Sequence, residues 1–255
     1  MDYQIQGKTA IITGAGGGLG AAVAEKLMAE GCNAVIADIQ PEERVAAWIQ
    51  EIRQKYPADC HYVHTDVSSE EQINHLFDVA KDTFGQVDIV INNAGIWPTA
   101  YVKEMTTDSF RKTLDINLIG PFMLCKRMLN YCLENERKGK IVNLVSQAAF
   151  GGSTSGHAHY AASKAGLVGF TVSLAREAAP YGINVNAVAP GIMETPIIAD
   201  ALKDPERRQK YLDRIPLGRV ATAEEVARIV LFLASSQSDY MTGATLDATG
   251  GMLMR

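Results

Sequence analysis

Two residues four positions apart, Tyr160 and Lys164, have types and spacing that could do chemistry. An apolar helical pattern continues from them to Leu174, so both side chains are expected on one face of a helix. A phenol has a pKa near ~10 and is a poor base at neutral pH unless a nearby cation favours the phenolate. Lowering that pKa by about three units takes roughly 4 kcal/mol, which a close ammonium and one further cation could supply. The pair predicts a tyrosine base; the alternative is two residues on a solvated helix face.

Two polar residues upstream could join such a base. Ser146 directly follows residues 141–145, an apolar run typical of a buried strand. A hydroxyl there would lie at the carboxyl end of a strand, where open α/β sheets bind their ligands. Asn117 is surrounded in sequence by apolar residues, and a buried amide must be hydrogen-bonded. It marks either a structural polar contact or a site that orders water, and the sequence leaves both open.

A glycine-rich turn stands near the start of the chain. Residues 14–20 contain five glycines between an apolar strand at 8–13 and a helical pattern that runs to Glu30. This strand, turn and helix order is typical of a pyrophosphate site at a helix N-terminus. The next strand, at 33–37, ends in Asp38, where a carboxylate can accept hydrogen bonds from ribose hydroxyls but repels a 2′-phosphate. We therefore expect NAD and not NADP, the alternative being that Asp38 only caps the loop that follows it.

The elements that must position these residues alternate along the chain. Further strands are expected at 61–65, 87–91, 141–145, 183–189 and 244–248, and helices at 41–56, 68–84, 106–133, 160–174 and 222–234. The strands are continuous apolar runs, which favours a parallel sheet covered on both faces. The fold class is therefore α/β: a Rossmann-like doubly wound parallel sheet of about seven strands with helices on both faces. One domain is expected over residues 1–255, with a polar, lid-like excursion at about 191–217.

Helix ends and composition add further expectations. Ser68 with Glu71, and Thr222 with Glu225, have the spacing of capping boxes. The chain has 255 residues, 47% of them hydrophobic, and a net charge of −5, so it lacks the basic surface that nucleic acid or an anionic membrane would need. No run approaches the ~20 apolar residues of a membrane span, and we expect a cytoplasmic protein. The four cysteines are expected to be free thiols, and no spacing suggests a metal site.

Several motifs in order resemble those of the short-chain dehydrogenase/reductase family along nearly the whole chain. Thr13-Gly14-x-x-x-Gly18-x-Gly20, Asn92-Asn93-Ala94-Gly95 and Tyr160-x-x-x-Lys164 match three motifs of the family. Ser146 and Asn117 occupy the positions of its catalytic serine and asparagine. Pro190-Gly191 with Thr195 matches the segment that holds the nicotinamide carboxamide, and Asp66-Val67 the adenine-side pair.

The resemblance implies hydride exchange between a secondary alcohol or ketone and a nicotinamide ring. Tyr160 would be the base, Ser146 would bind the substrate oxygen, Lys164 would lower the pKa of Tyr160 and hold the ribose, and Asn117 would order a water that relays protons. The implied cofactor-binding residues are Gly14, Gly18, Leu19, Gly20, Asp38, Asp66, Val67, Asn93, Ala94, Gly95, Tyr160, Lys164, Pro190, Gly191, Met193 and Thr195. By position, Trp97, Gln147 and His157 would touch the substrate, expected to be a small polyol or a sugar-like molecule.

Two alternatives remain from the sequence. The first is a 3-oxoacyl-thioester (acyl carrier protein) reductase, which residues 214–219 resemble, although Asp38 argues against the NADPH that such reductases mostly use. The second is a dinucleotide-binding sensor without activity, against which the complete set of catalytic residues argues. Around Leu167 the helix after Tyr160 is apolar on most of its circumference, so we expect a second copy of the chain to cover it. The resemblance implies a homotetramer.

Overall fold

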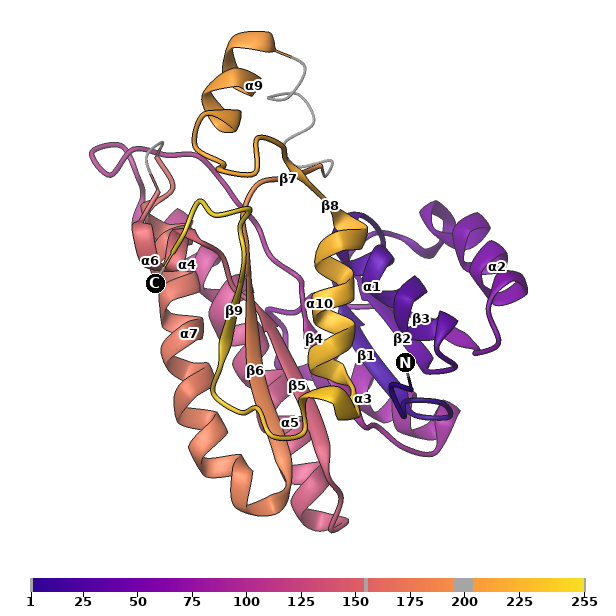
Figure 1. Ribbon diagram of the computed structural model, residues 1–255. Coiled ribbons are helices and arrows are strands. Elements are labelled where there is room, and N and C mark those ends of the chain that lie inside the picture. The colour runs from indigo at the N-terminus through magenta and orange to yellow at the C-terminus, as the bar shows by residue number, and fades with distance from the viewer. Residues whose placement is uncertain (1, 154–155, 195–203, 255) are drawn as a thin grey trace.

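A computed structural model describes residues 2–153, 156–194 and 204–254, and its centre is one seven-stranded sheet (Figure 1). The strand order is β3-β2-β1-β4-β5-β6-β9, and every neighbouring pair is parallel. The strands are β1 (Thr9–Thr13), β2 (Asn33–Asp38), β3 (Cys60–His64), β4 (Ile89–Asn92), β5 (Gly139–Leu144), β6 (Ile183–Pro190) and β9 (Thr245–Ala248). The predicted doubly wound sheet is confirmed. From β1 the strands are added toward one edge of the sheet as far as β3, and from β4 they are added toward the other edge. Folds of this class bind ligands at such a point, between β1 and β4.

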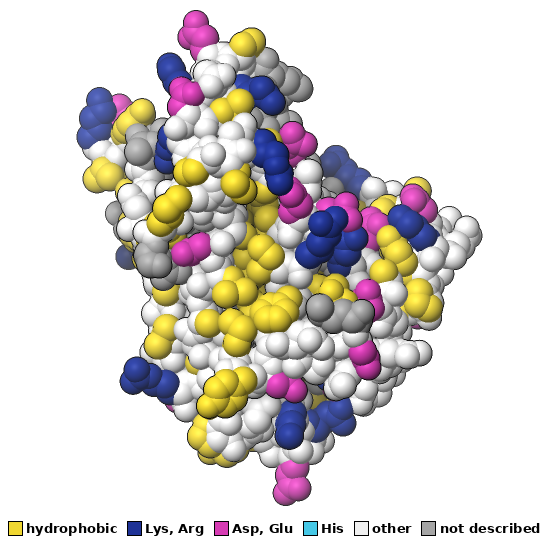
Figure 2. All heavy atoms as spheres, viewed as in Figure 1, with side chains coloured by type: hydrophobic (Ala, Val, Ile, Leu, Met, Phe, Trp, Pro, Cys, Tyr) yellow, Lys and Arg dark blue, Asp and Glu magenta, His cyan; other side chains and the backbone are white. Residues whose placement is uncertain are grey.

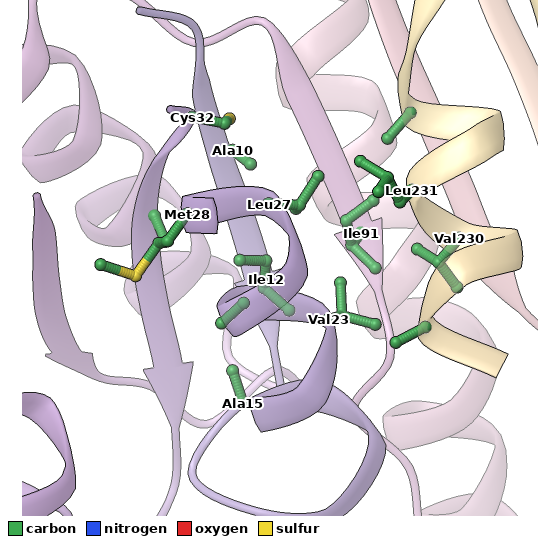
Figure 3. Packing of buried hydrophobic residues seen from close by; sticks show 14 of the residues in the cluster. Ala10, Ile12, Ala15, Val23, Leu27, Met28, Cys32, Ile91, Val230 and Leu231 are labelled. Carbon is green, nitrogen blue, oxygen red and sulfur yellow. The ribbon is translucent and has the colours of Figure 1, made fainter. Parts of the chain in front are cut away.

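Helices cover both faces of the sheet because successive strand residues point to opposite sides. On one face, Ile12 and Ile91 pack with α1 (Gly18–Ala29), α2 (Ala46–Lys55) and α10 (Ala223–Ala234); Figure 3 shows Val23 and Leu27 between sheet and helix. On the other face, Ile11 packs with α3 (Glu70–Phe84), α5 (Gly120–Glu134) and α7 (Ala158–Ala178). These two apolar layers fix the strand ends from which the polar residues project.

The segment after β6 leaves the sheet. β7 (Met193–Glu194) and β8 (Ala221–Thr222) pair with each other, and α9 (Pro205–Leu212) projects beyond the carboxyl ends of the strands (Figure 1). Figure 2 shows charged side chains gathered on this projection and hydrophobic ones in the middle of the same face. Part of the excursion predicted at 191–217 lies outside the described residues; the described remainder holds α9 and the turn to Leu217.

The helix that carries Asn117 is interrupted. It begins at Thr106, whose side chain accepts a hydrogen bond from Ser109 N, and comprises α4 (Thr107–Leu114), a π-helical segment (Asp115–Ile119) and α5. The sequence predicted one continuous helix over 106–133. Single-turn π segments of this kind are frequent at functional sites.

Two predicted helix starts differ from the structure. The helix expected at 41–56 begins with a 3₁₀ turn (Glu42–Arg44), and α2 starts only at Ala46. The capping box predicted at Ser68 is wrong: Ser69 caps α3, since Ser68 is held by the Asp66 carboxylate through its N–H and its hydroxyl. The predicted capping box of Thr222 and Glu225 is confirmed at the start of α10, and α6 (Ala148–Gly151) is a short additional helix.

Two further observations bear on the sequence-based expectations. The four cysteines, which all lie among the described residues, are buried free thiols, as predicted. In the part of the chain that the structure describes, no helix is both long and apolar enough to cross a membrane.

Candidate active site

A cavity of about 600 Å³ lies at the carboxyl ends of the strands, at the point where the strand order reverses. Its walls come from the glycine turn after β1, from the segments that follow β2 to β6, and from α7. Of the sixteen predicted cofactor-binding residues, fourteen line it: Gly14, Gly18, Leu19, Asp38, Asp66, Val67, Asn93, Ala94, Gly95, Tyr160, Lys164, Pro190, Gly191 and Met193. Gly20 does not line the cavity, and Thr195 lies outside the described residues.

At two positions of the glycine turn, a side chain would clash with the neighbouring backbone. Gly14 has a φ of +63°, and a Cβ on it would lie 2.7 Å from Ala94 Cα. A Cβ on Gly20 would lie 2.3 Å from the Gly14 carbonyl oxygen, so Gly20 permits α1 to pack against the turn. Gly17, directly before α1, has open space around its Cβ position and lines the cavity. An open backbone at a helix N-terminus fits the pyrophosphate of a dinucleotide.

Asp38 ties the end of β2 to the glycine turn. Its side chain is buried, Oδ2 accepts from Gly16 N at 2.8 Å, and Oδ1 accepts from Gln40 N at 3.0 Å. The loop-capping contact that the sequence left as an alternative is therefore present. Each carboxylate oxygen has more than one acceptor site, so the same group can also accept from a ribose hydroxyl in the cavity.

The turn after β4 is held against the turn after β1. Asn93 Nδ2 donates to Thr13 O and to Gly14 O, both at 2.9 Å. The Thr13 hydroxyl accepts from Asn93 N and from Ala94 N, both at 3.1 Å. These four hydrogen bonds hold the turns after β1 and β4 together at the edge of the cavity.

Ser146, Tyr160 and Lys164 meet on one wall of the cavity. Ser146 follows β5, its Oγ accepts from Ala148 N at 3.1 Å, and its side chain lies close enough to Tyr160 to affect the pKa of the phenol. Tyr160 and Lys164 project from α7 on one face, with Lys164 Nζ 5.9 Å from the centre of the Tyr160 ring. Lys164 Nζ donates to Leu144 O at 2.7 Å, which fixes the ammonium beneath the strand end.

Burial dominates the pKa values of this pair. Desolvation raises the pKa of Tyr160, and the nearby Ser146 side chain opposes that rise. Desolvation lowers the pKa of Lys164 to about 8. The protein by itself thus does the opposite of the predicted lowering at Tyr160, because the apolar surroundings outweigh the effect of Ser146. A second positive charge would be needed to favour the phenolate.

Asn117 lies beside the cavity and not in its wall. Its Nδ2 donates to Ile96 O at 2.9 Å and to Ser163 Oγ at 3.1 Å, and its Oδ1 accepts from Ile96 N at 2.8 Å. Both amide hydrogens are therefore used by the protein. The structural contact is therefore present, because Asn117 fastens the segment after β4 to α7; the ordering of a water by Asn117 stays a prediction.

The three predicted substrate residues, Trp97, Gln147 and His157, all line the cavity. The Trp97 and His157 rings are stacked with centroids 4.1 Å apart, and His157 Nδ1 is 2.7 Å from Pro98 O. Ser153, Tyr211 and Arg214 line the same cavity. Tyr211, on α9, and Arg214 lie in the excursion predicted at 191–217, but the sequence singled out neither of them, and it missed Ser153.

Comparisons with known proteins agree with this architecture. A family model described as enoyl-(acyl carrier protein) reductase matches residues 14–253. The 3-oxoacyl-[acyl-carrier-protein] reductase of Aquifex aeolicus is 40% identical over 252 residues, covering 99% of this chain and 100% of the relative. The 3beta-hydroxysteroid dehydrogenase 1 of Eggerthella lenta is 40% identical over 254 residues, covering 100% of this chain and 97% of the relative.

Among solved structures, a candidate 2-deoxy-D-gluconate 3-dehydrogenase from Agrobacterium tumefaciens with bound NADP superposes with a TM-score of 0.90. It is 33% identical, and the match covers 100% of this chain and 99% of the other. Relatives with different substrates thus share the full length of this chain. The chain belongs to the short-chain dehydrogenase/reductase family.

Proposed function

We propose that this protein is an NAD-dependent oxidoreductase that interconverts a secondary alcohol and its ketone by hydride transfer. The observation that carries the proposal is the meeting of Ser146, Tyr160 and Lys164 on a wall of the cavity that also contains the glycine turn. Hydride transfer to or from a dinucleotide needs a pyrophosphate site, a proton acceptor and an oxygen-binding group in one cavity. The non-catalytic alternative gives no reason for all three to be together.

The protein residues have separate tasks in this reaction. A nicotinamide cofactor, when bound, would supply the acceptor or donor of the hydride. Tyr160 takes the hydroxyl proton during oxidation, and Ser146, beside it in the cavity wall, donates to the substrate oxygen as the carbonyl forms. Lys164, held by Leu144 O, supplies positive charge and a donor for the ribose. Asn117 holds the segment after β4 in place; a proton relay would use water at Lys164.

Asp38 supports NAD as the cofactor. Its carboxylate is fixed by Gly16 N and Gln40 N at the edge of the cavity, so it cannot turn away from a phosphate on the adenosine ribose. Two like charges about 4 Å apart repel by about 4 kcal/mol at an effective dielectric constant near 20. The Agrobacterium structure contains NADP, so the preference of this protein for NAD must be measured.

The cavity wall supports a small polyol or sugar-like substrate. Gln147, Ser153 and His157 offer hydrogen bonds, and Trp97 supplies one broad apolar surface. A volume of about 600 Å³, shared with a dinucleotide, favours a small molecule over a steroid or a long acyl chain. The 3-oxoacyl-thioester reductase remains the second candidate because of the 40% identity to the Aquifex enzyme.

A panel of secondary alcohols, polyols, hydroxy acids and a 3-oxoacyl thioester, assayed by nicotinamide absorbance with both cofactors, tests the proposal. We expect turnover of small alcohols with NAD, and a Tyr160→Phe variant that binds NADH normally but loses at least 99% of turnover. A strong preference for NADPH with the thioester would favour the reductase. Normal NADH binding without turnover of any substrate would favour the sensor.

We further propose a homotetramer that works in the cytoplasm. Ile119, Phe122 and Val172 on the helices at one side of the sheet are 37–42% exposed, which supports contact with another copy. Free buried thiols are typical of a reducing compartment. Light scattering of the purified protein tests the assembly: a monomer would contradict it.

A further inference from the structure

One cation in the cavity wall has no task in the chemistry described so far. The charged side chains that line the cavity, among the described residues, are Asp38, Asp66, Lys164 and Arg214. Asp38 ends β2 and Asp66 follows β3, on the side of the sheet that the adenosine half would occupy, and Lys164 donates a hydrogen bond to Leu144 O. Arg214 remains, on the segment that follows α9.

We propose that Arg214 binds a carboxylate of the substrate, so that the alcohol oxidised by this protein is a hydroxy acid. The inference rests on the proposed function and narrows its substrate class. Arginine presents planar, paired N–H donors that match the two oxygens of a carboxylate.

The backbone around Arg214 is anchored. Arg214 N donates to Tyr211 O at 3.1 Å, and the next residue, Ile215, is buried and donates from its N to Leu212 O at 2.9 Å. Ile215 packs directly against Gly250, because a Cβ on that glycine would lie 2.7 Å from Ile215 Cγ2. Leu217 N donates a hydrogen bond to Gly250 O at 3.1 Å. The guanidinium is therefore carried on a turn fixed to the end of β9.

A second arginine in the same segment shows the contrast. Arg219 is bound by both oxygens of Glu225, at 2.6 and 2.8 Å, and does not line the cavity. Arg214 forms no ion pair with any carboxylate in the described ranges 2–153, 156–194 and 204–254, and it does line the cavity. The segment thus places one neutralised arginine outside the site and one without a counter-charge in its wall.

The rest of the substrate wall is neutral and suits a hydroxylated acid. His157 Nδ1 contacts the Pro98 carbonyl, which only accepts, so Nδ1 carries a proton and the other ring nitrogen, Nε2, is left for a bound substrate. Gln147 and Ser153 add neutral donors and acceptors. No carboxylate among the described residues of this wall opposes a bound anion, since both acidic residues belong to the adenosine side.

The test compares acids with their neutral amides: D-gluconate with D-gluconamide, and 3-hydroxybutyrate with 3-hydroxybutyramide, each with NAD. We expect wild type to prefer at least one acid over its amide by about 10- to 100-fold in kcat/KM, as for a charge-assisted hydrogen bond. Arg214→Gln should lower kcat/KM for that acid by about the same factor and change the amide by less than about threefold. Arg214→Lys should restore part of the loss, because it keeps the charge but not the fork.

Arg208→Gln is the matched control, because Arg208 is exposed on α9 and does not line the cavity. Its kinetics should equal those of wild type. The Kd of NADH, measured by fluorescence, should be the same in wild type and in Arg214→Gln. A weaker Kd for NADH would instead assign Arg214 to a cofactor phosphate and overturn the proposal.

The remaining outcomes separate this proposal from the proposed function. If the wild-type enzyme oxidises neutral alcohols as well as the acids, or oxidises neutral alcohols and no acid, the role of Arg214 is overturned. The proposed secondary alcohol dehydrogenase activity then stays in place. Wild type that oxidises none of the panel with either cofactor overturns the proposed function itself. Equal losses for acid and amide in Arg214→Gln would show a general structural effect and also overturn the proposal.

Discussion

Two glycines of the turn after β1 allow a matched test of how the cofactor site is built. Gly20→Ala would place a Cβ 2.3 Å from Gly14 O, 2.6 Å from Asn93 Nδ2 and 2.8 Å from Ala15 Cα. Ordinary contacts between heavy atoms are about 3.5 Å, so the turn would have to move by about 1 Å. Gly17→Ala meets nothing within 4 Å, and its φ of 176° is extended backbone that any residue adopts.

The two variants should therefore fail in different ways. Overpacking of this kind destabilises by about 1–3 kcal/mol, and the higher helix propensity of alanine returns up to about 1 kcal/mol. Because three atoms lie within 2.8 Å of the added Cβ, the cost should be near 3 kcal/mol and the net loss about 2 kcal/mol, so we expect Gly20→Ala to lower Tm by about 4–8 °C, at about 2–4 °C per kcal/mol. Gly17→Ala should keep the Tm of wild type but weaken NADH binding by about tenfold or more, because the added methyl group would occupy part of the cavity that Gly17 lines.

Thermal unfolding without cofactor and NADH fluorescence titration check this prediction. Gly20→Ala should lose both stability and affinity, whereas Gly17→Ala should lose affinity alone. An unchanged Tm in Gly20→Ala, or an equal loss of stability in both variants, would refute the packing argument.

Three other perturbations have defined outcomes. Asp38→Asn removes the charge near the adenosine ribose and should lower the ratio of kcat/KM for NAD over NADP by about 10- to 100-fold; an unchanged ratio would mean that Asp38 does not select the cofactor. Burial lowers the pKa of Lys164 to about 8 from 10.5, so from pH 8 to 9.5 the unfolded chain binds more protons at this residue and stability rises with pH. Between these two pH values the free energy of unfolding should rise by about 2 kcal/mol more in wild type than in Lys164→Met, as measured by chemical denaturation. An equal change with pH in both proteins would contradict this prediction. Thr222→Ala removes the capping box of α10 and should cost about 1 kcal/mol in denaturation with unchanged kcat/KM, so a loss of activity without a loss of stability would contradict the capping role.

Much of the fold could be predicted because periodicity and glycine spacing are local. The apolar runs that became β1 to β6 pair in one parallel sheet, and the turn at 14–20 lies where the strand–turn–helix pattern placed it. The helix start at Ser69 was misjudged by one residue, because Ser68 and Ser69 both satisfy the capping pattern. Only the competing carboxylate of Asp66 decides between them.

The site was predictable where residues follow a motif and not where they meet through tertiary contacts. Ser146, Tyr160 and Lys164 were expected together and do line one wall. The partners of Asn117, on the segment after β4 and on α7, could not be read from spacing. The direction of the pKa of Tyr160 also depends on burial, which a sequence does not reveal. Arg214 was missed as a site residue because its segment has no periodicity.

The π segment at Asp115–Ile119 has a consequence for insertions and deletions. Such a segment holds one residue more than the helical turn it replaces. Removing one residue there would therefore restore a regular turn and leave the residues after it facing as before. Removing one residue within α5 would instead rotate everything after it by about 100°, since a helix turns once in 3.6 residues, and the apolar stripe around Leu124 would leave its place against the sheet. Chains of this architecture should therefore accept a one-residue deletion in the π segment far more readily than one in the regular helix that follows.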